Sequence, residues 1–146
     1  MNQPTVLVVE DDPDHLELTL IAIEESDFAH HVVIARNGRE ALDYLFGEGT
    51  HQGRATDDQP ELVLLDLGLP VMNGLQVMNR MRDDPRTFFI PIVMLTSASE
   101  ESRAVHAFKG GLNSYVSKPL DTSKFNEQLQ QVSQYWRISN FAPLSF

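Results

Sequence analysis

The chain contains no cysteine among its 146 residues, so no disulfide bridge contributes to its stability. It also lacks a basic amino-terminal region, and its first apolar run, residues 6–9, ends at Glu10. A run this short is neither a signal peptide nor a membrane span. We therefore predict a soluble, cytoplasmic protein.

Basic side chains are scarce. The sequence has 11 Lys and Arg against 21 Asp and Glu, and its formal net charge is −10. Such a chain repels phosphate backbones, so direct nucleic-acid binding is not expected.

The length of the chain suits one compact domain. Its composition, with 42% hydrophobic and 22% charged residues, is typical of a globular protein.

Short apolar runs alternate with amphipathic stretches along the chain. Strands are predicted at residues 5–9, 31–35, 61–66, 90–95 and 114–117. Helices are predicted after Asp12-Pro13 to about Ser26, after Asn37-Gly38, from Leu75 to about Asp84-Pro85, over residues 98–109, and from Thr122 to Trp136. This alternation predicts an α/β protein with a parallel sheet.

The main irregular segment is residues 47–60, an exposed loop with three glycines and the pair Asp57-Asp58. It is long for a connection in a compact domain, which favours a functional or mobile insertion. A tolerated surface insertion explains it equally well.

Polar residues follow the predicted strands. Glu10-Asp11-Asp12 ends the first, Asp66 the third, Thr96 follows the fourth and Lys118 the fifth. Because ligands bind beyond the carboxyl ends of parallel strands, these residues predict a site at one edge of the sheet.

Crowded carboxylates raise the pKa of at least one of them unless a cation balances their charge. Mg²⁺ prefers a few carboxylates together with water and a phosphate oxygen. An aspartate can attack phosphorus to give an acyl phosphate, while a lysine and a hydroxyl contact the phosphoryl oxygens. The pattern therefore predicts phosphoryl chemistry with a divalent metal.

Five ordered motifs resemble the CheY-like receiver domains of two-component signalling. They are Val8-Val-Glu-Asp-Asp12, Leu65-Asp-Leu-Gly-Leu-Pro70, Asn73-Gly74, Leu95-Thr-Ser-Ala98 and Tyr115-Val-Ser-Lys-Pro119. The resemblance implies a flavodoxin-like (βα)5 doubly wound sheet with strand order 2-1-3-4-5. It further implies a receiver domain over residues 1–136, with residues 137–146 as a tail and no effector domain.

The resemblance also implies residue roles. Asp66 would accept the phosphoryl group from a sensor histidine kinase, and Lys118 would pair with Asp66 and then with the phosphoryl oxygen. Mg²⁺ would be bound by Asp11, Asp66 and the Gly68 carbonyl, with Glu10 acting mostly through water. Thr96 and Tyr115 would move on activation, although Tyr115 is also plausible as a static strand residue. The protein would be a signalling phosphoacceptor rather than an enzyme acting on other substrates.

One position departs from the family. Gly68 stands two residues after Asp66, where the family usually carries a larger side chain that controls water access to the acyl phosphate. The dephosphorylation rate is therefore not given by the resemblance.

The loop of residues 47–60 and the tail from Tyr135 to Phe146 are similar to those of the small regulators paired with cyanobacterial phytochromes. This narrower resemblance implies a light-regulated histidine kinase as phosphodonor and a homodimer. The apolar tail residues Phe141, Leu144 and Phe146 either fray or cover a surface patch.

Two other functions compete with a signalling phosphoacceptor. A Mg²⁺-dependent phosphohydrolase of the haloacid-dehalogenase type also uses a strand-end aspartate, but it needs an acid/base aspartate where this chain has Gly68. A degenerate receiver would bind partners without phosphorylation, and the complete set of Asp11, Asp66, Thr96 and Lys118 argues against it.

The histidines His15, His30, His31 and His51 lack metal-ligand spacing and are predicted to lie on the surface.

Overall fold

The computed structural model describes residues 5–25, 31–96 and 114–117, together with residue 127. In chain order the elements are β1 (Thr5–Val9), α1 (Pro13–Glu25), β2 (His31–Ala35), α2 (Gly38–Phe46), the 3-10 turn η1 (Gly49–His51), β3 (Leu62–Asp66), α3 (Gly74–Arg82), β4 (Ile92–Thr96) and β5 (Ser114–Ser117). The helices predicted over residues 98–109 and from Thr122 lie outside the described residues. Within the described part of the chain, no helix combines the length and apolarity needed to cross a bilayer.

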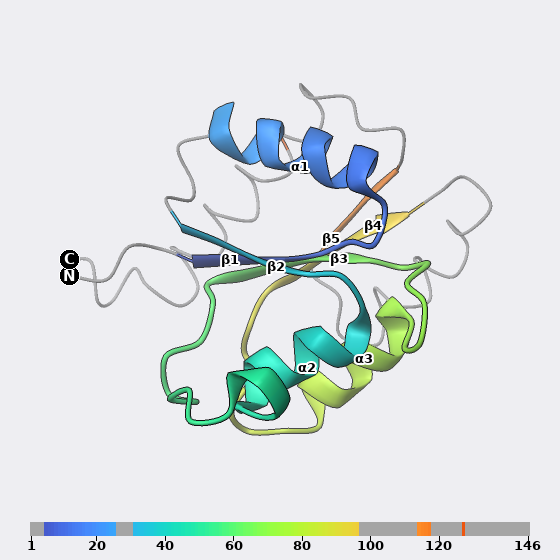
Figure 1. The fold of residues 1–146 in the computed structure, drawn as a ribbon. Helices are drawn as coiled ribbons and strands as arrows, with labels where there is room; N and C mark the ends of the chain where they lie inside the picture. The colour runs from blue at the N-terminus through green and yellow to red at the C-terminus, as the bar shows by residue number, and fades with distance from the viewer. Residues whose placement is uncertain (1–4, 26–30, 97–113, 118–126, 128–146) are drawn as a thin grey trace.

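Five parallel strands form one sheet in the order β2-β1-β3-β4-β5, which confirms the predicted strand order. Helix α1 covers one face, whereas α2 and α3 cover the other (Figure 1). The fold class is therefore the predicted doubly wound α/β sheet.

The register brings the carboxyl ends of the central strands together. Val9, the last residue of β1, pairs with Ala35 of β2 and with Leu65 of β3. Asp66 pairs with Leu95 of β4, one residue before Thr96. The residues that follow these strands therefore lie at the same edge of the sheet.

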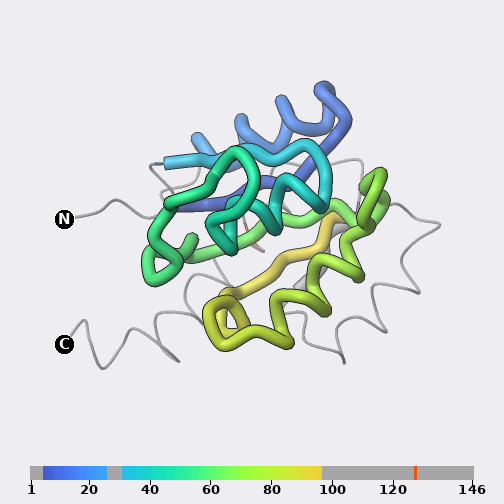
Figure 2. The backbone as a smooth tube through the Cα atoms, turned by 60° about the horizontal axis from the view of Figure 1, so that its bottom comes forward, coloured from blue at the N-terminus to red at the C-terminus, as the bar shows by residue number. Residues whose placement is uncertain are grey.

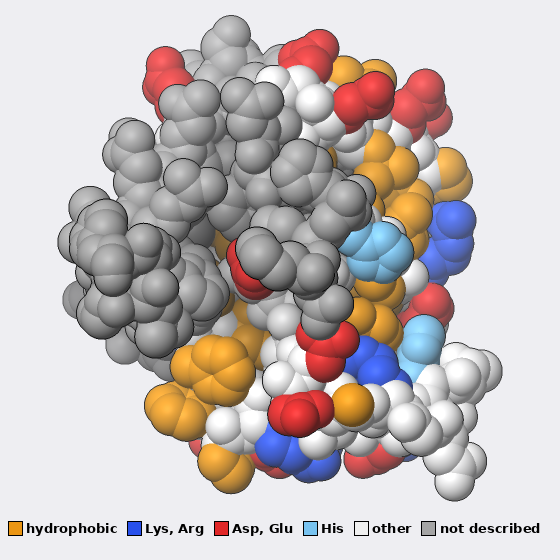
Figure 3. All heavy atoms as spheres, turned by 90° about the vertical axis from the view of Figure 1, so that its left-hand side faces the viewer, with side chains coloured by type: hydrophobic (Ala, Val, Ile, Leu, Met, Phe, Trp, Pro, Cys, Tyr) orange, Lys and Arg blue, Asp and Glu red, His pale blue; other side chains and the backbone are white. Residues whose placement is uncertain are grey.

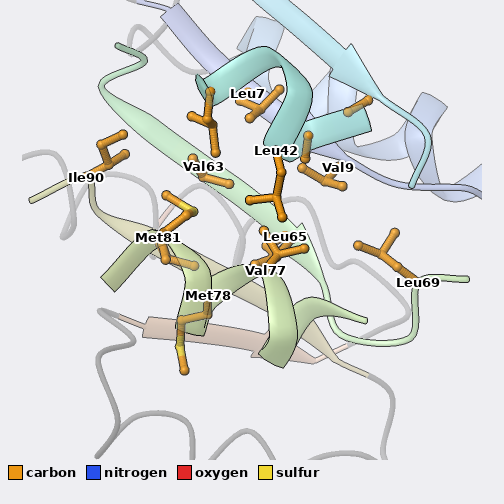
Figure 4. Close-up of a cluster of buried hydrophobic side chains, with 14 of the residues drawn as sticks. Leu7, Val9, Leu42, Val63, Leu65, Leu69, Val77, Met78, Met81 and Ile90 are labelled. Carbon is orange, nitrogen blue, oxygen red and sulfur yellow. The ribbon is translucent and has the colours of Figure 1, made fainter. Parts of the chain in front are cut away.

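Both faces of the sheet are buried, which explains why its strands are continuous apolar runs. Leu7 and Val9 belong to the core under α2 and α3, where Figure 4 shows them with Val63 and Leu65 of β3. Val6 and Val8 point to the opposite face and join the core under α1. Helix α1 contributes its spaced apolar residues Leu16, Ala22 and Ile23 to that second core.

Local capping sets where the helices begin. The Asp12 carboxylate accepts hydrogen bonds from the backbone N–H groups of Asp14 (2.9 Å) and His15 (3.3 Å), so it caps α1 as predicted. Asn37 caps α2 through the Glu40 N–H at 2.8 Å. Asn73 and Gln76 form a reciprocal capping box that starts α3.

Two strand starts differ from the sequence prediction. Strand β3 begins at Leu62 rather than residue 61, and β4 begins at Ile92 rather than residue 90. The Ile90 N–H donates to the Thr87 carbonyl at 3.1 Å and therefore belongs to the loop. Pro91 has no N–H, and it joins the ladder only through its carbonyl, which accepts from the Val63 N–H of β3 at 3.0 Å. Ile90 is nevertheless fully buried, and apolarity alone does not separate a buried loop residue from a strand residue.

The segment of residues 47–60 is more structured than the predicted exposed loop. Arg54 donates to the Tyr44 carbonyl at 2.8 Å and to the Asp58 carbonyl, and its guanidinium lies 3.9 Å from the centre of the Tyr44 ring. Gln59 Nε2 donates to the Leu45 carbonyl at 2.8 Å. These bonds tie the segment to the end of α2, and Figure 2 shows it folded back there.

Candidate functional site

Three carboxylates meet at the carboxyl edge of the sheet. Glu10 and Asp11 directly follow β1, and Asp66 is the last residue of the neighbouring strand β3. One oxygen from each lies within 4.8 Å of the other two. We call these residues the acidic triad. Their grouping agrees with the prediction that strand ends would bring them together.

Two members of the acidic triad are buried, which strengthens the repulsion among its carboxylates. Glu10 is fully buried and Asp66 is only 5% exposed, whereas Asp11 is exposed. Buried carboxylates are screened poorly by water, so their mutual repulsion is stronger than at the surface. A hard divalent cation with oxygen ligands matches this donor set, since Mg²⁺ and Mn²⁺ prefer carboxylates. Asp11, on the exposed side, leaves the set accessible from solvent.

The backbone around Asp66 holds its carboxylate in a defined position. The Gly68 N–H donates to Asp66 Oδ1 at 3.1 Å, and the Leu67 N–H donates to the Leu95 carbonyl at 3.0 Å. Gly74 closes the loop by donating to the Leu67 carbonyl at 3.1 Å. A Cβ on Gly74 would lie 2.6 Å from the Asp66 carbonyl oxygen, so only glycine permits α3 to start this close to β3.

His15 lies beside the acidic triad, although the sequence predicted only a surface histidine. Its side chain is 41% exposed, and Nδ1 lies 4.0 Å from Glu10 Oε1 and 3.8 Å from Asp12 Oδ2. The cause is the first turn of α1, which places residue 15 over the end of β1. The sequence indicates only that residue 15 lies in the first turn after the cap Asp12, and it does not indicate that this turn faces the end of β1.

Thr96 is the last residue of β4 and is fully buried. Its neighbour Leu95 pairs with Asp66, so Thr96 lies at the same sheet edge as the acidic triad. Tyr115 pairs with Met94 within β5, and only its backbone is described. Lys118 lies outside the described residues. The switch and charge-balancing roles of these three residues stay predictions.

The fold and the carboxylate-bearing sheet edge define a receiver-type α/β domain. The family model for the response regulator receiver domain matches residues 6–130, so the chain belongs to that family. Receiver domains are signalling proteins of two-component systems that interact with histidine kinases, and they are not enzymes in the usual sense.

Individual relatives place the chain within this family. It is 33% identical over 138 residues to the "Probable methanogenesis regulatory protein FilR2" of Methanothrix harundinacea, covering 94% of this chain and 86% of that protein. The solved bacteriophytochrome response regulator RtBRR is 40% identical with a TM-score of 0.83, covering 95% of this chain and 83% of that one.

A third relative is the response regulator Rcp1 of Synechocystis, 28% identical over 92% of this chain and 90% of Rcp1. Its Mn²⁺-bound structure matches with 26% identity and a TM-score of 0.74, covering 91% of this chain and 94% of that one. The structural neighbours thus include phytochrome-associated regulators, in agreement with the narrower resemblance in the sequence.

Proposed function

We propose that this chain accepts a phosphoryl group on Asp66 from a sensor histidine kinase, with Mg²⁺ held by the acidic triad. The observation that supports this most strongly is the convergence of three carboxylates from β1 and β3 within 4.8 Å of one another. The metal would offset negative charge on the transferred group. Asp11 and Asp66 would bind it directly with the Gly68 carbonyl, and Glu10 would act mostly through water.

The transfer itself forms one bond and breaks one bond. An Asp66 carboxylate oxygen bonds to phosphorus, and the P–N bond of the donor phosphohistidine breaks, with the imidazole nitrogen taking the electron pair. The Gly68 N–H, which donates to Asp66 Oδ1 at 3.1 Å, orients the carboxylate for this attack. Lys118 and the Thr96 hydroxyl would contact the phosphoryl oxygens. The main contribution of the protein to the transfer would therefore be to position the reacting groups and the charges around them.

The signal would leave the domain through a change of shape. In this proposal the buried Thr96 moves toward the phosphoryl group and Tyr115 follows into the space that is released. Residues 1–136 would form the receiver and residues 137–146 a tail, with output by protein contact or by homodimerisation. The similarity to the bacteriophytochrome response regulator RtBRR supports a phytochrome-type kinase as the donor. In this proposal the kinase and the chain meet in the cytoplasm.

Phosphorylation by a small donor tests the proposal. Wild type, Asp66→Asn and Asp14→Asn are incubated with acetyl phosphate, with Mg²⁺ or with EDTA, and their intact masses are measured. Asp14 is an exposed carboxylate at the start of α1 and serves as the matched control. Wild type and Asp14→Asn should each gain one phosphoryl group with Mg²⁺ only, and Asp66→Asn should gain none.

Three results would contradict the proposal. Wild-type labelling of Asp66→Asn would move the acceptor elsewhere, and unlabelled wild type would favour a degenerate receiver. Turnover of phosphate esters would favour the phosphohydrolase. Size-exclusion chromatography before and after labelling tests dimerisation separately, since an unchanged monomer would remove that output while leaving phosphorylation intact.

A further inference from the structure

Val71, in the loop between β3 and α3, combines two properties that are unfavourable for an apolar residue. Its side chain is 84% exposed, and its φ is 67°. Among the described residues it is the one residue other than glycine with a positive φ. Single exposed apolar side chains are ordinary on a protein surface, but a β-branched residue with positive φ is a genuine outlier. The isolated domain therefore gains no packing from this side chain in return for the backbone strain.

The backbone on both sides of Val71 is fixed. Leu69 is buried in the core under α2 and α3, and the Met72 N–H donates to the Pro70 carbonyl at 2.7 Å. Gly38, the first residue of α2, lies so close that a Cβ there would collide with the Met72 carbonyl oxygen. Valine also has few χ1 rotamers. Covering this side chain with another surface would therefore cost little conformational entropy.

The loop that carries Val71 lies at the carboxyl edge of the sheet, beside Asp66. Its two ends are held together, because the Gly74 N–H donates to the Leu67 carbonyl at 3.1 Å, and a Cβ on Gly74 would lie 2.6 Å from the Asp66 carbonyl oxygen. Figure 1 shows the loop beyond the end of β3 and next to the start of α3. Val71 precedes Gly74 by three residues, so their Cα atoms are at most about 11 Å apart.

Phosphoryl transfer from a protein would bring a partner over this edge. Asp66 is only 5% exposed, and the exposed residues around it are Asp11 and Gly68. A phosphohistidine must therefore approach from the carboxyl edge of the sheet. A specific interface covers about 800 Å² on each partner, which corresponds to a disc of roughly 16 Å radius. A disc of that size centred on Asp66 includes the loop with Val71.

We infer that Val71 is a docking contact for the histidine-kinase domain that donates the phosphoryl group, and that it enters an apolar depression beside the phosphohistidine. This inference rests on the proposed function and adds a residue that binds the donor protein without taking part in the transfer chemistry. The strain at Val71 is then explained, because the side chain is packed only in the complex.

A comparison of a protein donor with a small donor tests this contact. A purified bacteriophytochrome histidine kinase is autophosphorylated with radiolabelled ATP and mixed with increasing concentrations of wild type, Val71→Asn, Val71→Ile or Phe88→Asn. Initial transfer rates give kcat and the KM for the receiver. Labelling by acetyl phosphate with Mg²⁺ and unfolding in urea are measured on the same four proteins.

Phe88→Asn is the matched control. Phe88 is a large apolar residue that is 55% exposed, and the substitution introduces the same polar side chain. It lies in the connection that precedes β4, at the edge where the strands start. Figure 3 shows the molecule from that side, which is opposite to the acidic triad. The control therefore removes exposed apolar surface without changing the edge that receives the donor.

Val71→Asn should raise the KM about five-fold with an unchanged kcat, while Val71→Ile and Phe88→Asn keep the wild-type KM. Acetyl phosphate should label all four proteins at the wild-type rate, because a small donor needs no docking surface. The urea midpoint of Val71→Asn should be at or above that of wild type, since asparagine tolerates a positive φ better than valine. A protein at least as stable as wild type that receives the phosphoryl group poorly from the kinase excludes damage to the fold as the cause.

A wild-type KM for Val71→Asn would overturn the inference, and so would an equal rise in KM for Phe88→Asn. Slower labelling of Val71→Asn by acetyl phosphate would also overturn it, because Val71 would then affect the reaction site itself. If acetyl phosphate labels wild type and the kinase does not, the docking contact fails while the phosphoacceptor function stands. If neither donor labels wild type, the proposed function itself fails.

Discussion

Replacing Asp11 by asparagine should stabilise the protein when no divalent cation is present. Asp11 is the exposed member of the acidic triad, and one of its oxygens lies within 4.8 Å of an oxygen of Glu10 and of Asp66. Asparagine keeps the size and hydrogen-bonding capacity of the side chain but removes one negative charge. The substitution therefore relieves repulsion without creating a cavity.

The size of the gain follows from Coulomb's law. Two unit charges at 4.8 Å, the upper limit for the oxygen–oxygen separations in the acidic triad, repel by about 0.9 kcal/mol in bulk water and by roughly 3.5 kcal/mol at an effective dielectric constant of 20. Because Asp11 is exposed, its interactions with both neighbours are closer to the lower value. We expect Asp11→Asn to raise the free energy of unfolding by about 1–2 kcal/mol in EDTA.

In the presence of Mg²⁺, wild type should become more stable than Asp11→Asn. A ligand that binds only the folded state stabilises by RT ln(1 + [L]/Kd), which is about 2.7 kcal/mol at one hundred times Kd. Wild type should gain this amount at saturating Mg²⁺, while Asp11→Asn gains much less because it lacks a direct ligand. Urea unfolding at matched ionic strength, in EDTA and across a Mg²⁺ titration, measures both effects.

Asp14→Asn is the matched control. Asp14 is exposed in the first turn of α1, where a negative charge favours the helix, so its removal should cost a few tenths of a kcal/mol to about 1 kcal/mol in either buffer. The reasoning is refuted if Asp11→Asn is less stable than wild type in EDTA. It is equally refuted if Mg²⁺ stabilises Asp11→Asn as much as Asp14→Asn.

Two further substitutions test features away from the acidic triad. Val71 has φ 67° and is 84% exposed, so Val71→Gly should raise the free energy of unfolding by about 1 kcal/mol in urea titrations, and a loss of stability would contradict the assigned backbone strain. Hydrogen bonds from the Arg86 side chain lower the pKa of Asp84 from 3.8 to about 2. Because the folded pKa is depressed, the stability from this pair is present above about pH 4 and is lost as the pH falls toward 2. The difference in unfolding free energy between wild type and Asp84→Asn should therefore shrink over that range, and a constant difference would contradict the Asp84–Arg86 interaction.

The strands were predictable because the sheet is buried on both faces. Residues such as Val6 to Val9 alternate between two cores and are apolar at every position. Helix starts were predictable from caps such as Asp12 and Asn37. The start of β4 was not, since Ile90 is as buried as a strand residue and only its hydrogen bond to Thr87 shows that it belongs to the loop.

The acidic triad was predictable because parallel strands must end at one edge, which fixes Glu10, Asp11 and Asp66 relative to one another. The position of His15 depends on how the first turn of α1 is set against β1, and residue spacing did not reveal it. The strained φ of Val71 depends on a three-residue turn in which the Met72 N–H donates to the Pro70 carbonyl at 2.7 Å. Neither feature has a compositional signature.

The structure of the segment at residues 47–60 could not be predicted from the sequence either. Glycines and acids predicted an exposed loop, but Arg54 stacks on Tyr44 and Gln59 bonds to the carbonyl of Leu45. Each of these contacts joins a residue of the segment to a residue of α2. Which groups of α2 face the segment depends on the complete fold, so the sequence alone does not predict the contacts.

A crystal structure of this protein grown with Mn²⁺ and measured at the manganese absorption edge tests the central claim most directly. An anomalous peak should lie within coordination distance of one oxygen each of Asp11 and Asp66. Manganese density found only elsewhere, or carboxylates that remain uncoordinated at saturating Mn²⁺, would contradict a cation site built from the acidic triad.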